Sequence, residues 1–256
     1  MDYKKYCSLT FNNVLLDEDI DGYMTINVEG RGLKPRKLET VGIKGKDGSF
    51  IEESTINPNI LTVYFLIKAE NDKQKREILD KLNLRLHTEK DVVFSFGDEE
   101  GYRIGRVENV KSSPFDENQG VGSFDIYCQY PFRIVDSIEN KASSQFTINY
   151  PNVYKIEIEE IKVTPDNTEE VRIRNSSNGD IISLKNLDSQ KEITITKDSI
   201  TQNGRSIVNK LDWTISKWKS FSIKNNDVLQ FSGGIFTSKI RGLMLWYYFL
   251  IKIKNL

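Results

Sequence analysis

Glycine and charged residues crowd one stretch of the sequence, VEGRGLKPRKLETVGIKGKDGSF at residues 28–50. Such a stretch could cradle a phosphate, because glycine lets backbone N–H groups approach an anion and basic side chains balance its charge. The P-loop pattern, however, needs GxxxxGK followed by serine or threonine, and GIKGKDGS lacks that order. EGRGLKPRK lacks the third glycine of the dinucleotide fingerprint, and Pro35 suits a loop. We therefore expect no cofactor here, and interpret KGKDGSF as a hairpin turn in which Asp47 and Gly48 supply positive φ angles.

The other residues that could perform catalysis form no recognisable set. The single histidine, His87, follows a predicted helix. This position favours an interaction with the helix dipole or a capping role, and not a role as metal ligand or member of a catalytic triad. Two acidic clusters, Asp98-Glu99-Glu100 and Asp116-Glu117, fall in predicted loops, where charge is ordinary. A glycosidase needs two carboxylates that converge, which these positions do not indicate. We expect that the chain is not an enzyme.

Two tryptophans, Trp213 and Trp218, flank a short polar segment in LDWTISKWKSF. An exposed indole ring can stack on the apolar face of a sugar, so these residues could bind carbohydrate. The alternative is that they fill the core or a corner of their domain, which we favour. Trp246 lies within the apolar run LMLWYYFLI at residues 243–251, where we expect a buried strand.

Composition excludes several classes of protein. The 256 residues carry 36 basic and 37 acidic side chains, so the net charge of −1 does not indicate a nucleic-acid binder. The two cysteines, Cys7 and Cys128, have no metal-ligand spacing, so we expect no metal. They could form one disulfide, but we expect two thiols. The apolar run at residues 243–251 is shorter than the ~20 residues that a membrane-spanning helix needs. With no signal-peptide pattern at its start, the chain is expected to be a soluble protein made in the cytoplasm.

The first half of the chain reads as strands with one helix. PNILTVYFLIKA at residues 58–69 is the strongest strand pattern; it places Leu61, Val63, Phe65 and Ile67 on one face. A helix follows in ENDKQKREILDKLNLRLHTEK, with Asn71 or Asp72 as its N-cap. Its apolar stripe has helical spacing and consists of Ile78, Leu79, Leu82 and Leu86. Residues 1–135 therefore form an α+β domain with one amphipathic helix.

The second half reads as a β-sandwich. Short alternating runs such as KIEIEEIKV and EVRIRN are separated by turn signals such as NSSNGD and SGG. Many short strands with regular turns are typical of a sandwich or barrel. We therefore predict a mainly β chain, in which a linker at 136–144 precedes a sandwich at 145–256.

The order of motifs in the first half resembles the N-terminal domain of the siphophage distal tail protein (Dit) family. The resemblance rests on an FNN hairpin near the start, VEGRGL, KGKDGSF, ILTVYFLIKA, and a helix containing LDKLNLRL. FSFGDEEGYRIGRV and the closing FDIYCQYPF follow in the same order, so the resemblance covers about residues 1–135. The second half is similar to the family only in layout, since the family appends a galectin-like or carbohydrate-binding-module-like sandwich.

The resemblance implies a structural role in a phage or prophage tail tip, or baseplate. Family members form a hexameric ring, single or stacked in two, that joins the tail tube protein to the tail-associated hub protein and, in some phages, to receptor-binding proteins. The expected location is then the virion tail tip, after synthesis in the bacterial host cytoplasm. The alternative is an adaptor whose sandwich binds host cell-wall carbohydrate. On the ring reading, residues 28–50 are turns and edges that meet a neighbouring subunit or relax the backbone beside it. We predict that these residues are Gly30, Arg31, Gly32, Lys34, Arg36, Lys46 and Asp47.

Overall fold

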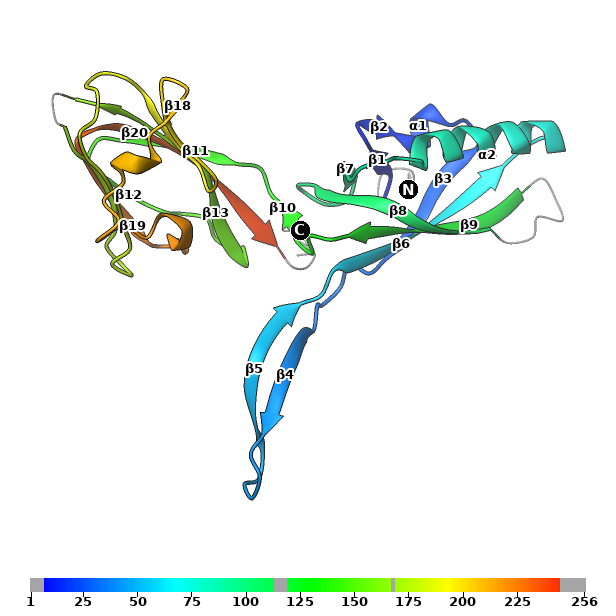
Figure 1. Cartoon of the computed structure of the whole chain (residues 1–256). Coiled ribbons are helices and arrows are strands. Elements are labelled where there is room, and N and C mark those ends of the chain that lie inside the picture. The colour runs from blue at the N-terminus through cyan, green and yellow to red at the C-terminus, as the bar shows by residue number, and fades with distance from the viewer. Residues whose placement is uncertain (1–6, 113–118, 167–168, 245–256) are drawn as a thin grey trace, which may run out of the picture. The chain divides into compact units, whose positions relative to one another are not determined.

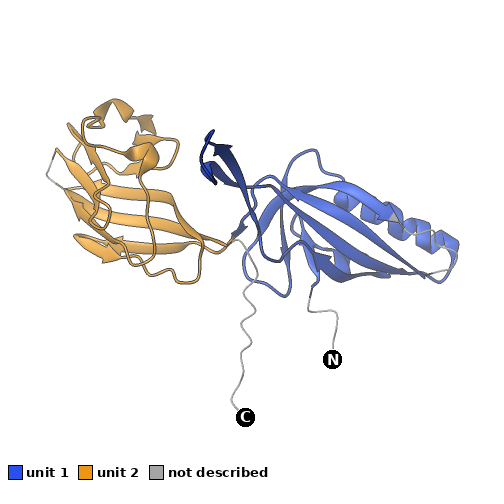
Figure 2. Ribbon diagram, turned by 90° about the horizontal axis from the view of Figure 1, so that it is seen from below, with its two compact units in different colours: residues 1–133, 245–256 blue, residues 134–244 orange. Residues whose placement is uncertain are grey.

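The computed structural model describes residues 7–112, 119–166 and 169–244. It divides into two compact units whose described residues are 7–133 and 134–244 (Figure 2). Strands dominate both units, so the prediction of a mainly β chain is confirmed. Residues 136–144, which we expected to link two domains, contain strand β11 (Ile138–Ala142), and β11 pairs with strand β20 (Gly234–Met244) of the second unit.

Unit 1 is built on a seven-stranded antiparallel sheet with the order β2-β1-β7-β8-β9-β6-β3 (Figure 1). Its strands are β1 (Leu9–Phe11), β2 (Val14–Leu15), β3 (Tyr23–Glu29), β6 (Asn59–Lys68), β7 (Val92–Phe96), β8 (Arg103–Ser112) and β9 (Gln119–Cys128). The short helix α1 (Leu16–Asp19) follows β2, and the long helix α2 (Asp72–Leu86) follows β6. Alternate side chains of this sheet pack with both helices into one core.

Strand β6 and helix α2 follow the sequence pattern closely. The four apolar residues predicted to share a face of β6 are all buried, while Tyr64 and Leu66 point to the other face and are half-buried. The α2 stripe is buried at Ile78, Leu82 and Leu86. The Asn71 side chain caps α2 by accepting a hydrogen bond from the Gln74 N–H at 2.9 Å, which satisfies one of the N–H groups that a helix start leaves open.

Among the strands that the structure describes, β4 (Arg36–Gly42) and β5 (Ser49–Ile56) pair only with each other. They form a hairpin that leaves the sheet between β3 and β6 (Figure 1). We call residues 36–56 the arm. The sequence predicted the hairpin turn at KGKDGSF but did not reveal that the hairpin would stand apart from the sheet.

Unit 2 is a sandwich of two antiparallel sheets around one core. The larger sheet has the order β10-β20-β13-β16-β17-β18, with β11 also paired to β20, and the smaller has the order β12-β19-β14-β15. The remaining bounds are β10 (Arg133–Ile134), β12 (Gln145–Thr147), β13 (Lys155–Pro165), β14 (Val171–Asn175), β15 (Ile181–Leu184), β16 (Ile193–Ile195), β17 (Ile200–Gln202), β18 (Arg205–Ser206), β19 (Val228–Ser232), and the 3₁₀ turns η2 (Val208–Lys210) and η3 (Trp218–Ser220). The predicted sandwich is therefore present.

Three smaller expectations have mixed outcomes. Cys7 and Cys128 are free thiols, as expected. His87 forms the C-cap of α2, where its backbone N–H donates to the Asn83 carbonyl at 2.9 Å. Of the predicted apolar strand at 243–251, the first two residues end β20; the rest, including Trp246, lie outside the described residues.

Candidate subunit interface

The arm is exposed on both faces. Every residue of β4 is exposed, and so is every residue of β5 before Ile56. Five of these exposed side chains, counting the turn, are apolar: Leu38, Val41, Ile43, Phe50 and Ile51. A two-stranded hairpin without a covering layer is at best marginally stable in water. The arm therefore has the properties of an interaction element rather than of a finished part of a core.

The pairing of β4 with β5 places apolar side chains opposite each other. Val41 lies opposite Phe50, and Thr40 lies opposite Ile51. Phe50 is 62% exposed and Ile51 60% exposed. Since cross-strand partners share a face of a ribbon, each face of the arm carries apolar surface that could pack on another protein.

The polar residues of the arm include one predicted interface residue in its strands and two at its tip. Arg36 donates to the Ser54 hydroxyl at 2.7 Å. At the tip the Lys46 N–H donates to the Ile43 carbonyl at 3.1 Å. Gly45 and Gly48 have positive φ angles, of 83° and 89°. Asp47 does not, so the prediction of a positive φ there was wrong: glycine, which lacks a Cβ, takes both left-handed positions.

The predicted residues Gly30 and Gly32 lie where the chain leaves β3 for the arm, and only Gly30 is constrained. Its φ is +84°, and a Cβ there would lie 2.2 Å from the Ile60 carbonyl oxygen. A side chain at this position would therefore collide with the backbone of β6. Gly32 has no atom within 4 Å of its virtual Cβ, so only Gly30 is needed for the close approach of the arm to the sheet.

Arg31, also predicted to meet a neighbouring subunit, contacts its own chain. Its guanidinium donates to Asp98 at 2.6 Å and lies 5.2 Å from the centre of the Phe96 ring. Both members of the ion pair are mostly buried. Because an arginine on an aromatic face with a carboxylate partner is held in one orientation, Arg31 fixes the base of the arm.

Lys34 completes the base. Its ammonium donates to the Gly30 carbonyl and to the Asn59 side-chain oxygen. Burial and the nearby guanidinium of Arg103 lower the pKa of Lys34. Lys34 therefore ties the segment after β3 to the start of β6, and both ends of the arm are anchored by contacts within unit 1.

A buried ion-pair cluster lies near this base, which the sequence did not indicate. The side chain of Glu99 is fully buried, accepts a bidentate pair of hydrogen bonds from Arg103, and lies 3.7 Å from the guanidinium of Arg133. Burial and Arg133 lower the pKa of Arg103 to about 9, so Arg103 keeps its charge at neutral pH. Asp98 and Glu99 lie in a turn, as expected, but they are not ordinary solvated charges, because Asp98 pairs with Arg31, 67 residues away, and Glu99 pairs with Arg103 and Arg133.

The tryptophans predicted to contact sugar have different surroundings. Trp218 is buried, its Nε1 donates to the Thr196 carbonyl at 2.8 Å, and the Lys219 ammonium lies 4.3 Å from the centre of its ring. Trp213 is 63% exposed. The open ring of Trp213 is therefore the better candidate for stacking on a ligand.

The described residues contain neither a candidate metal site nor a candidate membrane-spanning helix. No group of three or more histidine, cysteine, aspartate or glutamate residues there could hold a metal ion. Among the described helices, none has the length and apolar character to cross a membrane.

The chain resembles phage tail proteins in sequence and in fold. Residues 16–127 match the family described as phage tail protein RIFT-related domain. The crystal structure of the Dit protein of phage SPP1, described as a paradigm of the hub adsorption apparatus in phages that infect Gram-positive bacteria, superposes with a TM-score of 0.79. That match covers 93% of this chain and 99% of the SPP1 protein at 17% identity, so it establishes the fold.

Two structures of the phage P2 baseplate in its activated conformation, with Ca and with Sr, give TM-scores of 0.47 and 0.46. Their identities are 10% and 11%, and both matches cover 88% of this chain and 92% of the other. Among curated proteins, none matches this sequence.

Proposed function

We propose that this chain, which carries a phage tail protein RIFT-related domain at residues 16–127 and the Dit fold over almost all of its length, is a structural component of the tail tip of a siphophage or prophage. The observation that carries the proposal is the agreement of both units with one tail-tip protein. The role consists of binding and positioning other proteins, and it requires no catalysis. The protein acts at the virion tail tip after its synthesis in the host cytoplasm.

In this proposal, six subunits form a ring, and the assembly contains either one ring or two stacked rings. The arm supports it, because a closed ring needs two different patches on each protomer, one that reaches out and one that receives. Exposed apolar residues of the arm, such as Phe50 and Ile51, would be covered by the neighbouring copy. Arg36, Lys46 and Asp47 lie on the same hairpin and set register and partner choice.

Three of the other four predicted interface residues act indirectly. Gly30 permits the close approach of the arm to β6, while Arg31 and Lys34 hold its base. At Gly32 an added Cβ would meet no atom within 4 Å, so glycine is not required there. The ring would join the tail tube protein on one side to the tail-associated hub protein on the other, with receptor-binding proteins as further partners.

The test is the mass of the purified protein in solution. Light scattering behind a sizing column, over a range of concentrations, should give six or twelve times the chain mass of 29.6 kDa. Negative-stain images of the same fractions should contain annular particles. Monomers at every concentration, both alone and when mixed with the purified tail tube protein, would contradict the ring.

A second candidate function is binding of host cell-wall carbohydrate by unit 2. The observation that favours it is the exposed indole ring of Trp213, which a sugar could stack on. Binding to a cell-wall glycan array should be lost in Trp213→Ala and kept in the matched variant Ile215→Ala, whose side chain is also exposed nearby. Equal binding by the two variants would exclude stacking on Trp213.

A further inference from the structure

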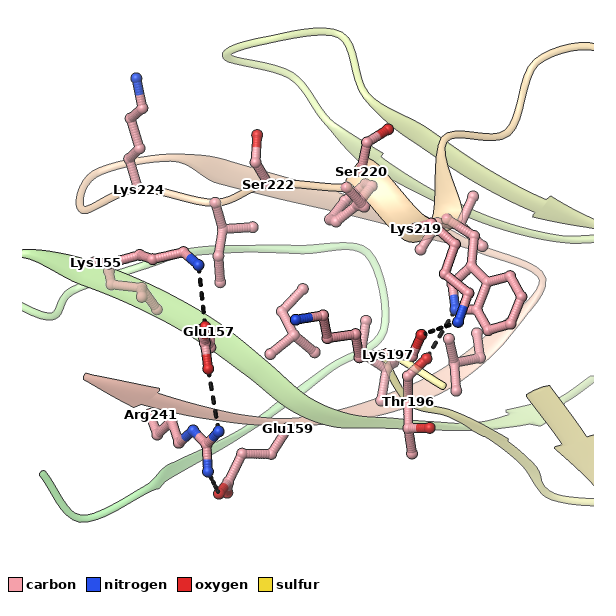
Figure 3. A pocket seen from close by; sticks show the side chains of 18 of the residues that line it. Lys155, Glu157, Glu159, Thr196, Lys197, Lys219, Ser220, Ser222, Lys224 and Arg241 are labelled. Carbon is pink, nitrogen blue, oxygen red and sulfur yellow. Dashed lines mark hydrogen bonds and ion pairs between the residues drawn. The ribbon is translucent and has the colours of Figure 1, made fainter. Parts of the chain in front are cut away.

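Unit 2 contains a groove of about 900 Å³ (Figure 3). Residues 153–159 line one wall, and residues 218–225 line another. Both are unbroken runs of consecutive residues. A groove over the face of a strand would be lined by alternate residues, because successive side chains point to opposite faces. The groove therefore runs along the edge of β13.

This edge of β13 lacks a neighbouring strand over part of its length. The ladder between β13 and β20 runs from Lys155 to Pro165. On the other edge, the ladder between β13 and β16 covers only residues 161–163. Within the described residues, no strand continues the position of β16 beside residues 155–159. An exposed strand edge is a template on which another chain can add a strand.

The floor of the groove is aliphatic. Five of its lining residues are isoleucines that face the sandwich core and are at most 5% exposed: Ile156, Ile161, Ile182, Ile195 and Ile223. A strand laid along the edge would turn every second side chain towards this floor. Those positions would suit apolar side chains.

The carboxylates on the groove wall already have cationic partners. Glu157 accepts hydrogen bonds from Lys155 at 3.0 Å and from Arg241 at 3.1 Å. Burial opposes ionisation, but these hydrogen bonds outweigh it and lower the pKa of Glu157. Glu159 lies 3.3 Å from Arg241 and 3.4 Å from Lys239.

Positive charge remains after these pairs are counted. The lining has five cationic residues and three anionic residues, an excess of two. In Figure 3 the ammonium of Lys197 points into the groove. The described residues include no carboxylate that pairs with it. A bound segment would therefore place its outward side chains near lysine, which favours acidic residues there.

Two other occupants fit less well. The buried ring of Trp218 at the groove is covered by Lys219, so it offers no open face to a neutral sugar. The chain's own residues 245–256 are apolar, but their only charged side chains are Lys252 and Lys254. Like charges would oppose docking of that segment between lysines.

We propose that this groove binds an extended segment of a partner protein, in which apolar and acidic residues alternate, as an added strand on the free edge of β13. Main-chain hydrogen bonds to the edge supply affinity, and the aliphatic floor and the lysines supply specificity, as in other cases of strand addition. The proposal concerns unit 2 alone and does not depend on the ring.

The experiment is a selection of displayed random heptapeptides on the full-length protein. Enriched peptides should alternate apolar and acidic residues. The best of them is then synthesised, and its affinity is measured by fluorescence anisotropy. Lys197→Glu should weaken its binding at least about tenfold. Lys162→Glu, which changes a lysine of β13 outside the groove lining, should leave the affinity unchanged.

N-methylation tests the strand pairing itself. Two forms of the peptide are compared, each methylated on one of the two sets of alternate backbone nitrogens. The form whose methylated nitrogens face β13 should not bind, and the form whose methylated nitrogens face away should bind like the unmodified peptide. Enrichment of peptides without acidic residues, or equal binding by both methylated forms, would overturn the proposal. So would an anionic glycan whose binding to an array is lost in Lys197→Glu, because the groove would then be a carbohydrate site.

Discussion

In the proposed ring, replacing Phe50 and Ile51 together by alanine should weaken the association of subunits without destabilising the subunit itself. Both side chains lie on the arm and are more than half exposed in the isolated chain. They make no part of either hydrophobic core, so their loss should change the free energy of unfolding by no more than about 0.5 kcal/mol. The substitutions should weaken only the contact in which a neighbouring copy covers these two side chains.

The size of that cost follows from their exposure. Complete burial of a large apolar side chain contributes about 1.5–3 kcal/mol, and about 60% of each side chain is still to be buried here. After allowance for the methyl group that alanine retains, the double variant should lose about 1–2.5 kcal/mol per interface. This corresponds to a weakening of association of about 5- to 70-fold.

Sedimentation velocity over a concentration series measures this change directly. The concentration at which rings dissociate should rise for Phe50→Ala/Ile51→Ala. It should not rise for Leu84→Ala, which removes an exposed leucine from α2. Rings of the double variant that dissociate at the wild-type concentration would refute the assignment of the arm to the interface.

Three further predictions concern stability within the units. Gly30→Ala should lower the free energy of unfolding of unit 1 by about 2–4 kcal/mol, because alanine there combines strain at positive φ with a collision with Ile60. Gly48→Ala, at a similar φ in open space, should lower it by only about 1 kcal/mol. Urea unfolding followed by the circular dichroism of α2 measures both changes. Glu99→Gln should lower the free energy of unfolding by about 3–5 kcal/mol in the same assay, because it leaves buried arginines without their carboxylate. A loss smaller than that caused by breaking a surface ion pair would disprove the stabilising role of the buried cluster. Because the pKa of Glu157 is lowered, the ionised carboxylate contributes fully to the free energy of unfolding above pH 4.5, the ordinary pKa, and this contribution is lost as the pH falls through the folded-state pKa. Below pH 4.5 the melting temperature of unit 2, followed by tryptophan fluorescence, should therefore fall less steeply in Glu157→Gln than in the wild type.

Local patterns predicted the regular elements well. Strand β6 and helix α2 bury the faces that their periodicity indicated, because each has one apolar side and a well-marked boundary. The arm shows where periodicity stops being informative. Its alternation of side chains is that of any strand, and whether the apolar side faces a core depends on what lies beside it.

The features of the candidate interface and of the tryptophans that the sequence did not reveal depend mostly on contacts between residues far apart in the chain. Arg31 and Asp98 are 67 residues apart, so nothing local to the glycine-rich stretch indicated that this arginine is held inside the subunit. The same holds for Trp213 and Trp218, which look equivalent in sequence. The hydrogen bond from Trp218 to Thr196, 22 residues away, helps to hold one in the sandwich while the other remains exposed.

The bare arm also links the lifetime of a subunit to its assembly. An uncovered hairpin opens more readily than a packed sheet, and proteases cut chains at segments that open. The arm and its turn carry Lys37, Lys44 and Lys46, so a trypsin-like protease would cleave a solitary subunit there first. Copies enclosed by their neighbours would be shielded at the same sites. In the proposed tail-tip role, surplus subunits would then be removed from the cell that makes them, while those already assembled would persist.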